Sequence, residues 1–407
     1  MLVSRNFVDL ITFTRASPAW RFNSSGLMVQ ESNGVARFDY DPVTRQPRGL
    51  LIEESRTNLL LQSNALDNAT WVKNGVTVTP GAAIGPDGAL SLAKIVTNNG
   101  ASFTGSSNSQ SFTKAASAIQ YTYSIFAKAG ELPRVRLFAN GIDTTTARCY
   151  CDVDLTNGSV AQIVQGTNGF ADLSVAISAI GGGIYRIAAT FTTDTATTLA
   201  CRIYPLNTSG SGDGVSGIFT GFTGAEVGAF ATSYIATTTA SVTRTADVAS
   251  LTDLTKIGFN PSLGTFYVEA MTGALGNSAT QNNLPHIVGL MKGTSSSAGD
   301  YLAFRLSQPA QMQINVGNTG TFSSINFTNT AVGSIEKMAA AGQGANISAA
   351  RNGVLGTPLT ARTWPADVDT LWIGSQAGTT RFWNGWVRAI RYYPKRMTDS
   401  ELQALTA

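Results

Sequence analysis

Apolar and polar residues alternate in short runs along much of the chain. In the run 119–128, Ile119, Tyr121, Tyr123 and Ile125 fall on one face of an extended strand. Gly-rich turns separate such runs at regular intervals, which is typical of a β-sandwich or jelly roll. Strands are therefore expected at Ser91–Val96, Gln120–Ala127, Val135–Ala139, Arg148–Asp154, Gly183–Phe191, Leu199–Leu206, Val227–Ile235 and Gly264–Gly273.

The composition favours the same fold class. Of the 407 residues, 41 are Gly and only 13% are charged, against about 25% in ordinary soluble domains. Such a chain is poor in helix formers and rich in strand and turn residues, so we expect an all-β protein. Its length exceeds one hydrophobic core. The pattern predicts an irregular leader at residues 1–62 and two tandem jelly-roll sandwiches at 63–246 and 247–407.

Charge and hydropathy argue against two classes of partner. The net charge is +3, from 28 basic and 25 acidic residues, and no basic run carries interleaved aromatics. A nucleic-acid partner is therefore not expected. No apolar run approaches the roughly 20 residues that cross a bilayer. The N-terminus also lacks the apolar segment and small-residue cleavage site of a signal peptide.

The segment Arg37–Ser63, RFDYDPVTRQPRGLLIEESRTNLLLQS, follows an opening with FTRAS at Phe13–Ser17. Together with SYI at Ser233–Ile235 and TRTADV at Thr243–Val248, it resembles phrases that recur in bacteriophage virion proteins. The resemblance implies a tail-fibre, tail-tip or capsid-fibre protein, assembled in the host cytoplasm and located in the virion. It also implies that the leader docks to other virion proteins. The residues themselves leave open whether its short strands pack on either sandwich or on a partner chain.

Both sandwiches carry resemblances of their own. The layout of residues 63–246 resembles the carbohydrate-binding-module type of jelly roll that phage tail proteins carry. Near the C-terminus, IGS at Ile373–Ser375 and NGWV at Asn384–Val387 resemble the end of concanavalin A-like, laminin-G-like jelly rolls. A short helix is expected at Thr398–Thr406, where Thr398 is the N-cap and Glu401 completes a capping box.

Sugar-binding sandwiches usually stack exposed aromatic rings on sugar faces, beside amide and guanidinium donors. The candidates for this role are Trp71, Arg134 and Arg136 in the first sandwich, and Trp364 and Trp383 in the second. Trp364 and Trp383 flank turns, so we expect both rings to be exposed. The aromatic residues expected in the cores instead are Tyr121, Tyr123, Trp372 and Trp386.

Catalytic and metal-binding patterns are not found in the sequence. The single histidine, His286, adjoins an apolar strand, and no serine has the surroundings of a nucleophile elbow. Glycoside hydrolysis needs only two carboxylates, but the E-x-D-x-x-E strand of concanavalin A-like glycosidases is missing. We expect no enzyme, no cofactor and no metal, although calcium at a loop acid such as Asp87 or Asp213 stays open. The carboxylates considered for hydrolysis are Glu53, Glu54, Asp152, Asp154, Glu269, Asp367 and Asp369.

The three cysteines, Cys149, Cys151 and Cys201, are expected to be buried free thiols in a β-sheet. Cys149 and Cys151 share one face of a strand, a geometry poor for joining each other. A disulfide from either of them to Cys201 stays open. Three cysteines and one distant histidine also lack the spacing of a structural zinc site.

We predict a non-catalytic virion protein whose sandwiches bind host-surface or environmental glycans, with weak contacts multiplied by oligomeric display. A homotrimer is expected by analogy with phage fibres alone. A first alternative is a purely structural decoration or baseplate protein without a ligand. A second is a polysaccharide depolymerase, which needs two carboxyl groups roughly 5–10 Å apart in a groove.

Overall fold

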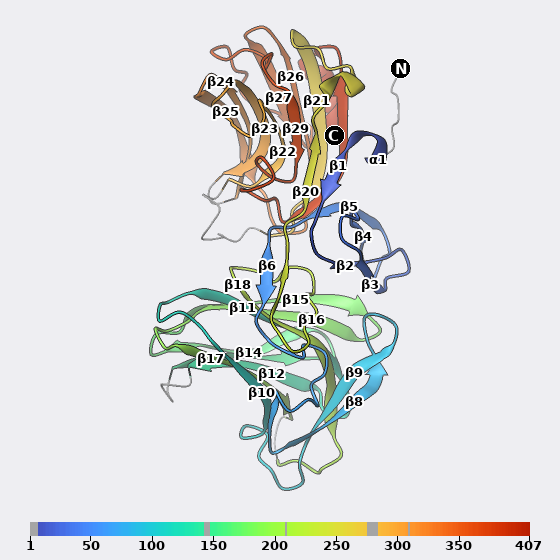
Figure 1. Cartoon of the computed structure of the whole chain (residues 1–407), viewed down its shortest axis with the longest axis vertical. Helices are drawn as coiled ribbons and strands as arrows, with labels where there is room; N and C mark the ends of the chain where they lie inside the picture. The colour runs from blue at the N-terminus through green and yellow to red at the C-terminus, as the bar shows by residue number, and fades with distance from the viewer. Residues whose placement is uncertain (1–6, 142–146, 208–209, 275–283, 308–309) are drawn as a thin grey trace.

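Two antiparallel β-sandwiches joined by a narrow neck make up the protein (Figure 1). The computed structural model describes residues 7–141, 147–207, 210–274, 284–307 and 310–407. The expected all-β class with two tandem sandwiches is confirmed. Within the described residues, no helix is both long and apolar enough to cross a membrane.

The first sandwich consists of two six-stranded sheets whose inner faces share one core, which includes Tyr121, Tyr123 and Ile125. The alternation of these three residues therefore places them in the core, as predicted. One sheet has the order β14 (Ser159–Thr167), β13 (Arg148–Asp154), β12 (Arg134–Gly141), β17 (Thr198–Leu206), β10 (Ser107–Thr113), β7 (Val72–Asn74). The other has the order β15 (Ala171–Gly181), β16 (Ile184–Thr192), β11 (Gln120–Ala129), β18 (Gly217–Val227), β9 (Leu90–Thr97), β8 (Val76–Ile84).

The second sandwich consists of two seven-stranded sheets around a separate core, which includes Phe266, Val268 and Ala270. One sheet has the order β1 (Thr12–Thr14), β20 (Val248–Leu251), β29 (Thr370–Ile373), β22 (His286–Met291), β23 (Asp300–Ser307), β24 (Gln311–Asn318), β25 (Thr321–Asn329). The other has the order β28 (Val354–Leu355), β27 (Asn346–Arg351), β26 (Ile335–Gln343), β21 (Leu263–Met271), β30 (Gly385–Tyr393), β5 (Pro47–Ile52), β4 (Phe38–Tyr40).

Three strands of the leader belong to the sheets of the second sandwich. Strand β1 pairs with β20, while β5 pairs with β30 and carries β4 on its outer edge. Leu50 and Ile52 are buried in this way in the second core, whereas Leu51 is buried on the opposite face of β5. Gly49 allows β5 to lie close to β30. Its φ is +114°, and a Cβ at this position would lie 2.5 Å from the carbonyl oxygen of Val387. The leader is thus part of the fold and not a separate irregular segment.

The remaining leader hairpin packs on the first sandwich. Strands β2 (Ala19–Phe22) and β3 (Met28–Glu31) pair with each other, and their side chains join a small apolar cluster on the outer face of β11 and β18. Trp20 lies 5.7 Å from Tyr234, and Phe126 and Phe222 belong to the same cluster. This cover explains why β11 is buried on both faces. The leader therefore lies between the two sandwiches (Figure 1).

The neck contains a two-stranded ribbon. The chain enters the first sandwich through β6 (Arg56–Asn58) and returns through β19 (Val242–Arg244), which pairs with β6. The expected division between residues 246 and 247 falls between β19 and β20. The short helices of the described chain are α1 (Phe7–Leu10), the 3-10 helix η1 (Leu254–Ile257) and α2 (Asp399–Thr406).

Several local predictions are confirmed and one is wrong. Thr398 caps α2, and the capping box with Glu401 is present. The three cysteines are buried free thiols, as expected. The strand expected at Val227–Ile235 is not formed, because β18 ends at Val227 and residues 228–235 follow an irregular path. Hydrogen bonds to Glu53 and Glu226 hold this path in place of a sheet ladder.

Candidate functional site

The tryptophans predicted to bind sugar are buried in the two cores. Trp71, Trp364 and Trp383 have exposed fractions of 0%, 2% and 1%. The prediction that Trp364 and Trp383 are exposed is wrong, and none of the three rings offers a face to a sugar. Each indole N–H instead donates to a backbone carbonyl, at 3.1–3.3 Å, on Gln62, Asn260 and Met271 respectively.

The tryptophans predicted to be in the core lie outside it. Trp372 is only partly buried on β29, because Leu371 and Ile373 take the inward positions of this period-2 strand. Trp386 is likewise partly buried on β30, next to the inward-facing Val387. The structure therefore buries the two tryptophans that were expected to be exposed, and leaves partly exposed the two that were expected in the core.

Arg136, another predicted site residue, lies on the outer face of the first sandwich. Its neighbours Val135 and Leu137 point into the core, so β12 presents Arg136 outward. The guanidinium forms a bidentate pair with Asp152 on β13, with nitrogen–oxygen distances of 2.6 and 2.8 Å. It also lies 3.9 Å above the ring centroid of Tyr150.

Aromatic rings surround this arginine on the same sheet face. Phe138 and Tyr150 are directly opposite on β12 and β13 and stack at 5.8 Å with an interplanar angle of 13°. Phe138 also contacts Tyr204 on β17 at 5.7 Å. Arg202, paired with Phe138 across β12 and β17, donates from Nε to Asn140 at 3.0 Å. We call Arg136, Phe138, Tyr150, Arg202 and Tyr204 the aromatic–arginine face.

Only part of this face was predicted from the sequence. The alternation in RVRLFAN places Arg134, Arg136 and Phe138 on one side of β12. Tyr150 and Arg202 come from other strands, and their positions beside Phe138 depend on the strand register. Arg134 lies at the rim, 36% exposed in its side chain and 3.7 Å from Asp154.

The carboxylates considered for hydrolysis are engaged with cations or backbone amides. Glu269 pairs with Arg388 at 2.9 Å, and Asp367 pairs with Lys292 at 2.8 Å. Asp369 accepts from the Gly293 amide at 2.7 Å. The other pairs are Glu54 with Arg56, Asp152 with Arg136, Asp154 with Arg134, and Glu53 with Arg37 and Arg244.

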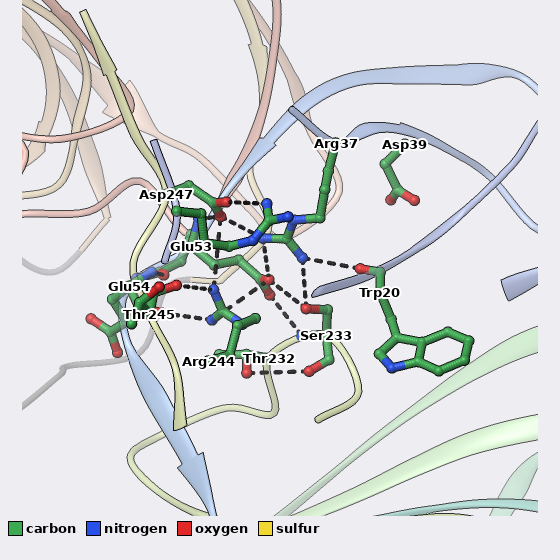
Figure 2. Close-up of polar contacts among 12 residues, drawn as sticks. Trp20, Arg37, Asp39, Glu53, Glu54, Thr232, Ser233, Arg244, Thr245 and Asp247 are labelled. Atoms are coloured by element: carbon green, nitrogen blue, oxygen red, sulfur yellow. Dashed lines mark hydrogen bonds and ion pairs between the residues drawn. The ribbon is translucent and has the colours of Figure 1, made fainter. Parts of the chain in front are cut away.

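The FTRAS, RFDYDP, GLLIEE and TRTADV phrases of the sequence converge on a buried charge network in the neck (Figure 2). Asp247 pairs with Arg37 and, at 3.0 Å, with Arg15. Glu53 pairs with Arg37 at 2.8 Å and lies 3.7 Å from Arg244. We call Arg15, Arg37, Glu53, Arg244 and Asp247 the neck network. Its residues come from the FTRAS, RFDYDP, GLLIEE and TRTADV phrases.

Hydrogen bonds extend this network to the first sandwich. Ser233 donates its amide and its hydroxyl to the Glu53 carboxylate, both at 2.7 Å. Burial alone would raise the pKa of Glu53, but the charges of Arg244 and Arg37 and the Ser233 hydrogen bonds outweigh burial and lower it. Burial opposes the charged form of Arg37, but Asp247 and Glu53 outweigh burial and raise its pKa. Both groups therefore stay charged in the interior.

The remaining candidates have local structural roles. His286 is fully buried, where Nδ1 lies 2.7 Å from the Leu284 carbonyl and burial lowers its pKa to about 3. Asp87 accepts from the Ser91 hydroxyl at 2.6 Å, and Asp213 accepts from the Ser216 amide and hydroxyl. No cluster of three potential metal ligands occurs among the described residues.

Comparisons with known proteins show limited similarity. No family model and no curated protein matches the chain. A sialidase carbohydrate-binding module (CBM40) of Ruminococcus gnavus, solved with α2,3-sialyllactose, is 16% identical over 36% of this chain and 83% of its own, with a TM-score of 0.30. A pentraxin of Limulus polyphemus is 8% identical over 36% and 70%, with a TM-score of 0.29. The leech intramolecular trans-sialidase is 16% identical over 36% and 23%, with a TM-score of 0.30. Similarities at this level carry no argument about the ligand of this chain.

Proposed function

We propose that this protein is a non-catalytic glycan-binding component of a bacteriophage virion, and that the aromatic–arginine face is its binding surface. The observation that carries the proposal is the grouping of two partly exposed rings, Phe138 and Tyr150, and two guanidiniums on one outer sheet face, beside the buried ring of Tyr204. Partly exposed rings such as Phe138 and Tyr150 provide flat apolar surface for the C–H face of a sugar. The fork of Arg136 already donates to Asp152, so Arg202 is the guanidinium that donates to hydroxyl or carboxylate oxygens of the sugar.

The virion part of the proposal is supported by the recurrent sequence phrases. Other virion proteins are proposed to dock on the leader. Its strands belong to the fold, but several of its apolar side chains are exposed. A homotrimer remains a prediction by analogy, in which weak sites gain strength from multiple display. The exposed apolar residues of the leader are Leu27, Val35, Phe38 and Val43.

The experiment is binding of the purified chain to an array of bacterial surface polysaccharides, with release of reducing ends measured in parallel. The variants are Tyr150→Ala and Arg202→Gln on the aromatic–arginine face. Phe322→Ala is the matched control, because Phe322 is an exposed aromatic on an edge strand of the second sandwich. We expect binding without release, a loss of at least about tenfold in affinity for both face variants, and no change for the control.

Each contrary outcome has a definite meaning. Release of reducing ends would show a depolymerase and overturn the non-catalytic proposal. The absence of binding on the array, or equal binding by Tyr150→Ala and wild type, would remove the aromatic–arginine face as a glycan site. For the virion part, the chain should co-sediment with phage particles on a density gradient, and its absence from them would contradict that part alone.

A further inference from the structure

A cavity of about 510 Å³ lies where the leader meets both sandwiches, apart from the aromatic–arginine face. Its volume is within the range of about 300–1,000 Å³ that is usual for small-molecule sites. The leader, the outer face of β15 and β16, and β30 all line it. The lining residues that matter for its chemistry are Trp20, Asp39, Arg48, Arg186, Phe230 and Trp386.

The cavity has two indole walls that are not part of either core. Trp20 and Trp386 are both partly buried. Trp386 is held firmly, because its Nε1–H donates to Asp39 at 2.8 Å and Arg48 lies 4.9 Å from its ring centroid. The indole N–H of Trp20, in contrast, has no hydrogen-bond partner within the part of the chain that the structure describes. A donor left unpaired in this way favours a ligand that supplies an acceptor.

Arg186 is a cation of the cavity wall that forms no ion pair with any carboxylate of the described residues. It projects from β16 beside Phe126, whose ring centroid lies 5.5 Å from its guanidinium carbon. Its Nη2 donates to the Thr232 carbonyl, and its Nε has no hydrogen-bond partner in the described residues. In the described ranges, no carboxylate oxygen lies within 4.0 Å of a guanidinium nitrogen of Arg186, which is the limit for an ion pair. Burial lowers the pKa of Arg186, and the attraction of Glu226 and Glu53 opposes this effect.

The other charges that line the cavity are already engaged. Arg48 pairs with Asp41 at 2.8 Å, and Arg21 pairs with Glu31. Glu53 belongs to the neck network. Asp39 accepts hydrogen bonds from the Phe22 amide and from the Trp386 indole, and burial raises its pKa. Arg186 is therefore the charged group of the wall, among the described residues, that has no opposite charge within ion-pair distance.

We propose that this junction cavity binds a carboxylate-bearing sugar, with the carboxylate at Arg186 and the sugar ring against Trp20. A planar guanidinium recognises a carboxylate in a bidentate manner, and an indole presents a large apolar face. A row of aromatic contacts connects the two groups, from Phe126 beside Arg186 through Phe222 and Tyr234 to Trp20. Three members of the row, Phe126, Tyr234 and Trp20, line the cavity. This site does not depend on the aromatic–arginine face.

The test is isothermal titration calorimetry of the full chain with D-glucuronate and D-galacturonate, and with D-glucose, D-galactose and acetate for comparison. We expect the acidic sugars to bind at least tenfold more tightly than both the neutral sugars and acetate. Arg186→Gln keeps a donor for the Thr232 carbonyl and should abolish the preference for the acidic sugar. Arg362→Gln is the control and should leave the titration unchanged, because Arg362 lies outside the cavity lining and outside the aromatic–arginine face.

The contrary outcomes are equally clear. Equal binding of acidic and neutral sugars, or no binding of either, would overturn the proposal, and binding of acetate as tight as that of D-glucuronate would mean an anion site without sugar recognition. Loss of binding in Arg202→Gln would assign it to the aromatic–arginine face. If Arg186→Gln fails to fold, Trp20→Phe removes only the unpartnered donor while it keeps a ring. Trp20→Phe should weaken D-glucuronate binding severalfold, and wild-type affinity in that variant would contradict the geometry.

Discussion

Arg37 and Asp247 lie 210 positions apart in the chain and form an ion pair with both side chains fully buried. Arg37 directly precedes β4 of the leader, and Asp247 directly precedes β20, where the chain returns from the first sandwich. Asp247 also accepts from the Glu53 amide at 2.9 Å. One carboxylate thus joins the outgoing and returning chains at the neck, and the RFDYDP and TRTADV phrases that contain these two residues form this junction.

Replacing Asp247 by Asn should destabilise the folded protein strongly. Arg15 and Arg37 would both lose a charged partner without gaining access to water. Removing one member of a buried ion pair typically costs about 3–5 kcal/mol, and we expect a loss of this size in the free energy of unfolding. Urea denaturation followed by circular dichroism measures it.

Asp41→Asn provides the matched control for Asp247→Asn. Asp41 pairs with Arg48 at 2.8 Å, but both side chains are partly exposed, and the amide oxygen of Asn can still accept from the Val43 and Thr44 backbone. A surface pair of this kind is worth at most about 1 kcal/mol. An equal loss of stability in both variants would show that the buried neck network stabilises the fold no more than a surface ion pair does.

The contribution of Glu53 should depend on pH in one direction. Its pKa is lowered in the folded protein, so its stabilisation is present above the ordinary Glu pKa of about 4.3 and is lost as the pH falls toward the folded value. The stability gap between wild type and Glu53→Gln should therefore be full at neutral pH and narrow below about pH 4. Asp39 and Glu226 have raised pKa values, but both proteins contain them and their effect cancels in the difference. Urea titrations at several pH values test this, and a gap that widens in acid would refute the assignment.

Deleting residues 1–62 should disrupt the second sandwich. The truncation removes β1, β4 and β5, exposes the edge of β30 and takes Leu50 and Ile52 out of the second core. We expect an aggregated product, or one without a cooperative thermal transition for residues 247–407, in differential scanning calorimetry. A soluble truncated protein with both sandwiches folded would show that the leader is an accessory.

The fold class could be predicted because strand alternation is a local property. Tyr121 and Tyr123 alternate with polar residues, and their burial followed from period 2 alone. The place of the leader could not be predicted in the same way. Leu50–Ile52 is an apolar strand in any context, and only the open edge of β30, more than 300 residues later, determines where it pairs.

The candidate sites depended even more on long-range pairing. Arg134 and Arg136 were predicted by residue type, as guanidinium donors, whereas Tyr150 and Arg202 join the same face through strand register. Trp20 and Arg186 come together only when the leader packs on the first sandwich. Proximity to a turn proved a poor guide to exposure for Trp364 and Trp383, because their N–H groups find backbone carbonyls inside the core.

Trp383→Ala should therefore act on stability and not on glycan binding. The ring is 1% exposed and packs in the second core, and truncation of a buried aromatic residue costs about 3–5 kcal/mol. Trp372→Ala is the matched control, because Trp372 is partly buried outside that core, and it should cost no more than about 2 kcal/mol. Urea unfolding measures both, and array binding at low denaturant should match wild type because the aromatic–arginine face lies in the other sandwich. A stable Trp383→Ala protein with weakened binding would instead restore Trp383 as a sugar contact.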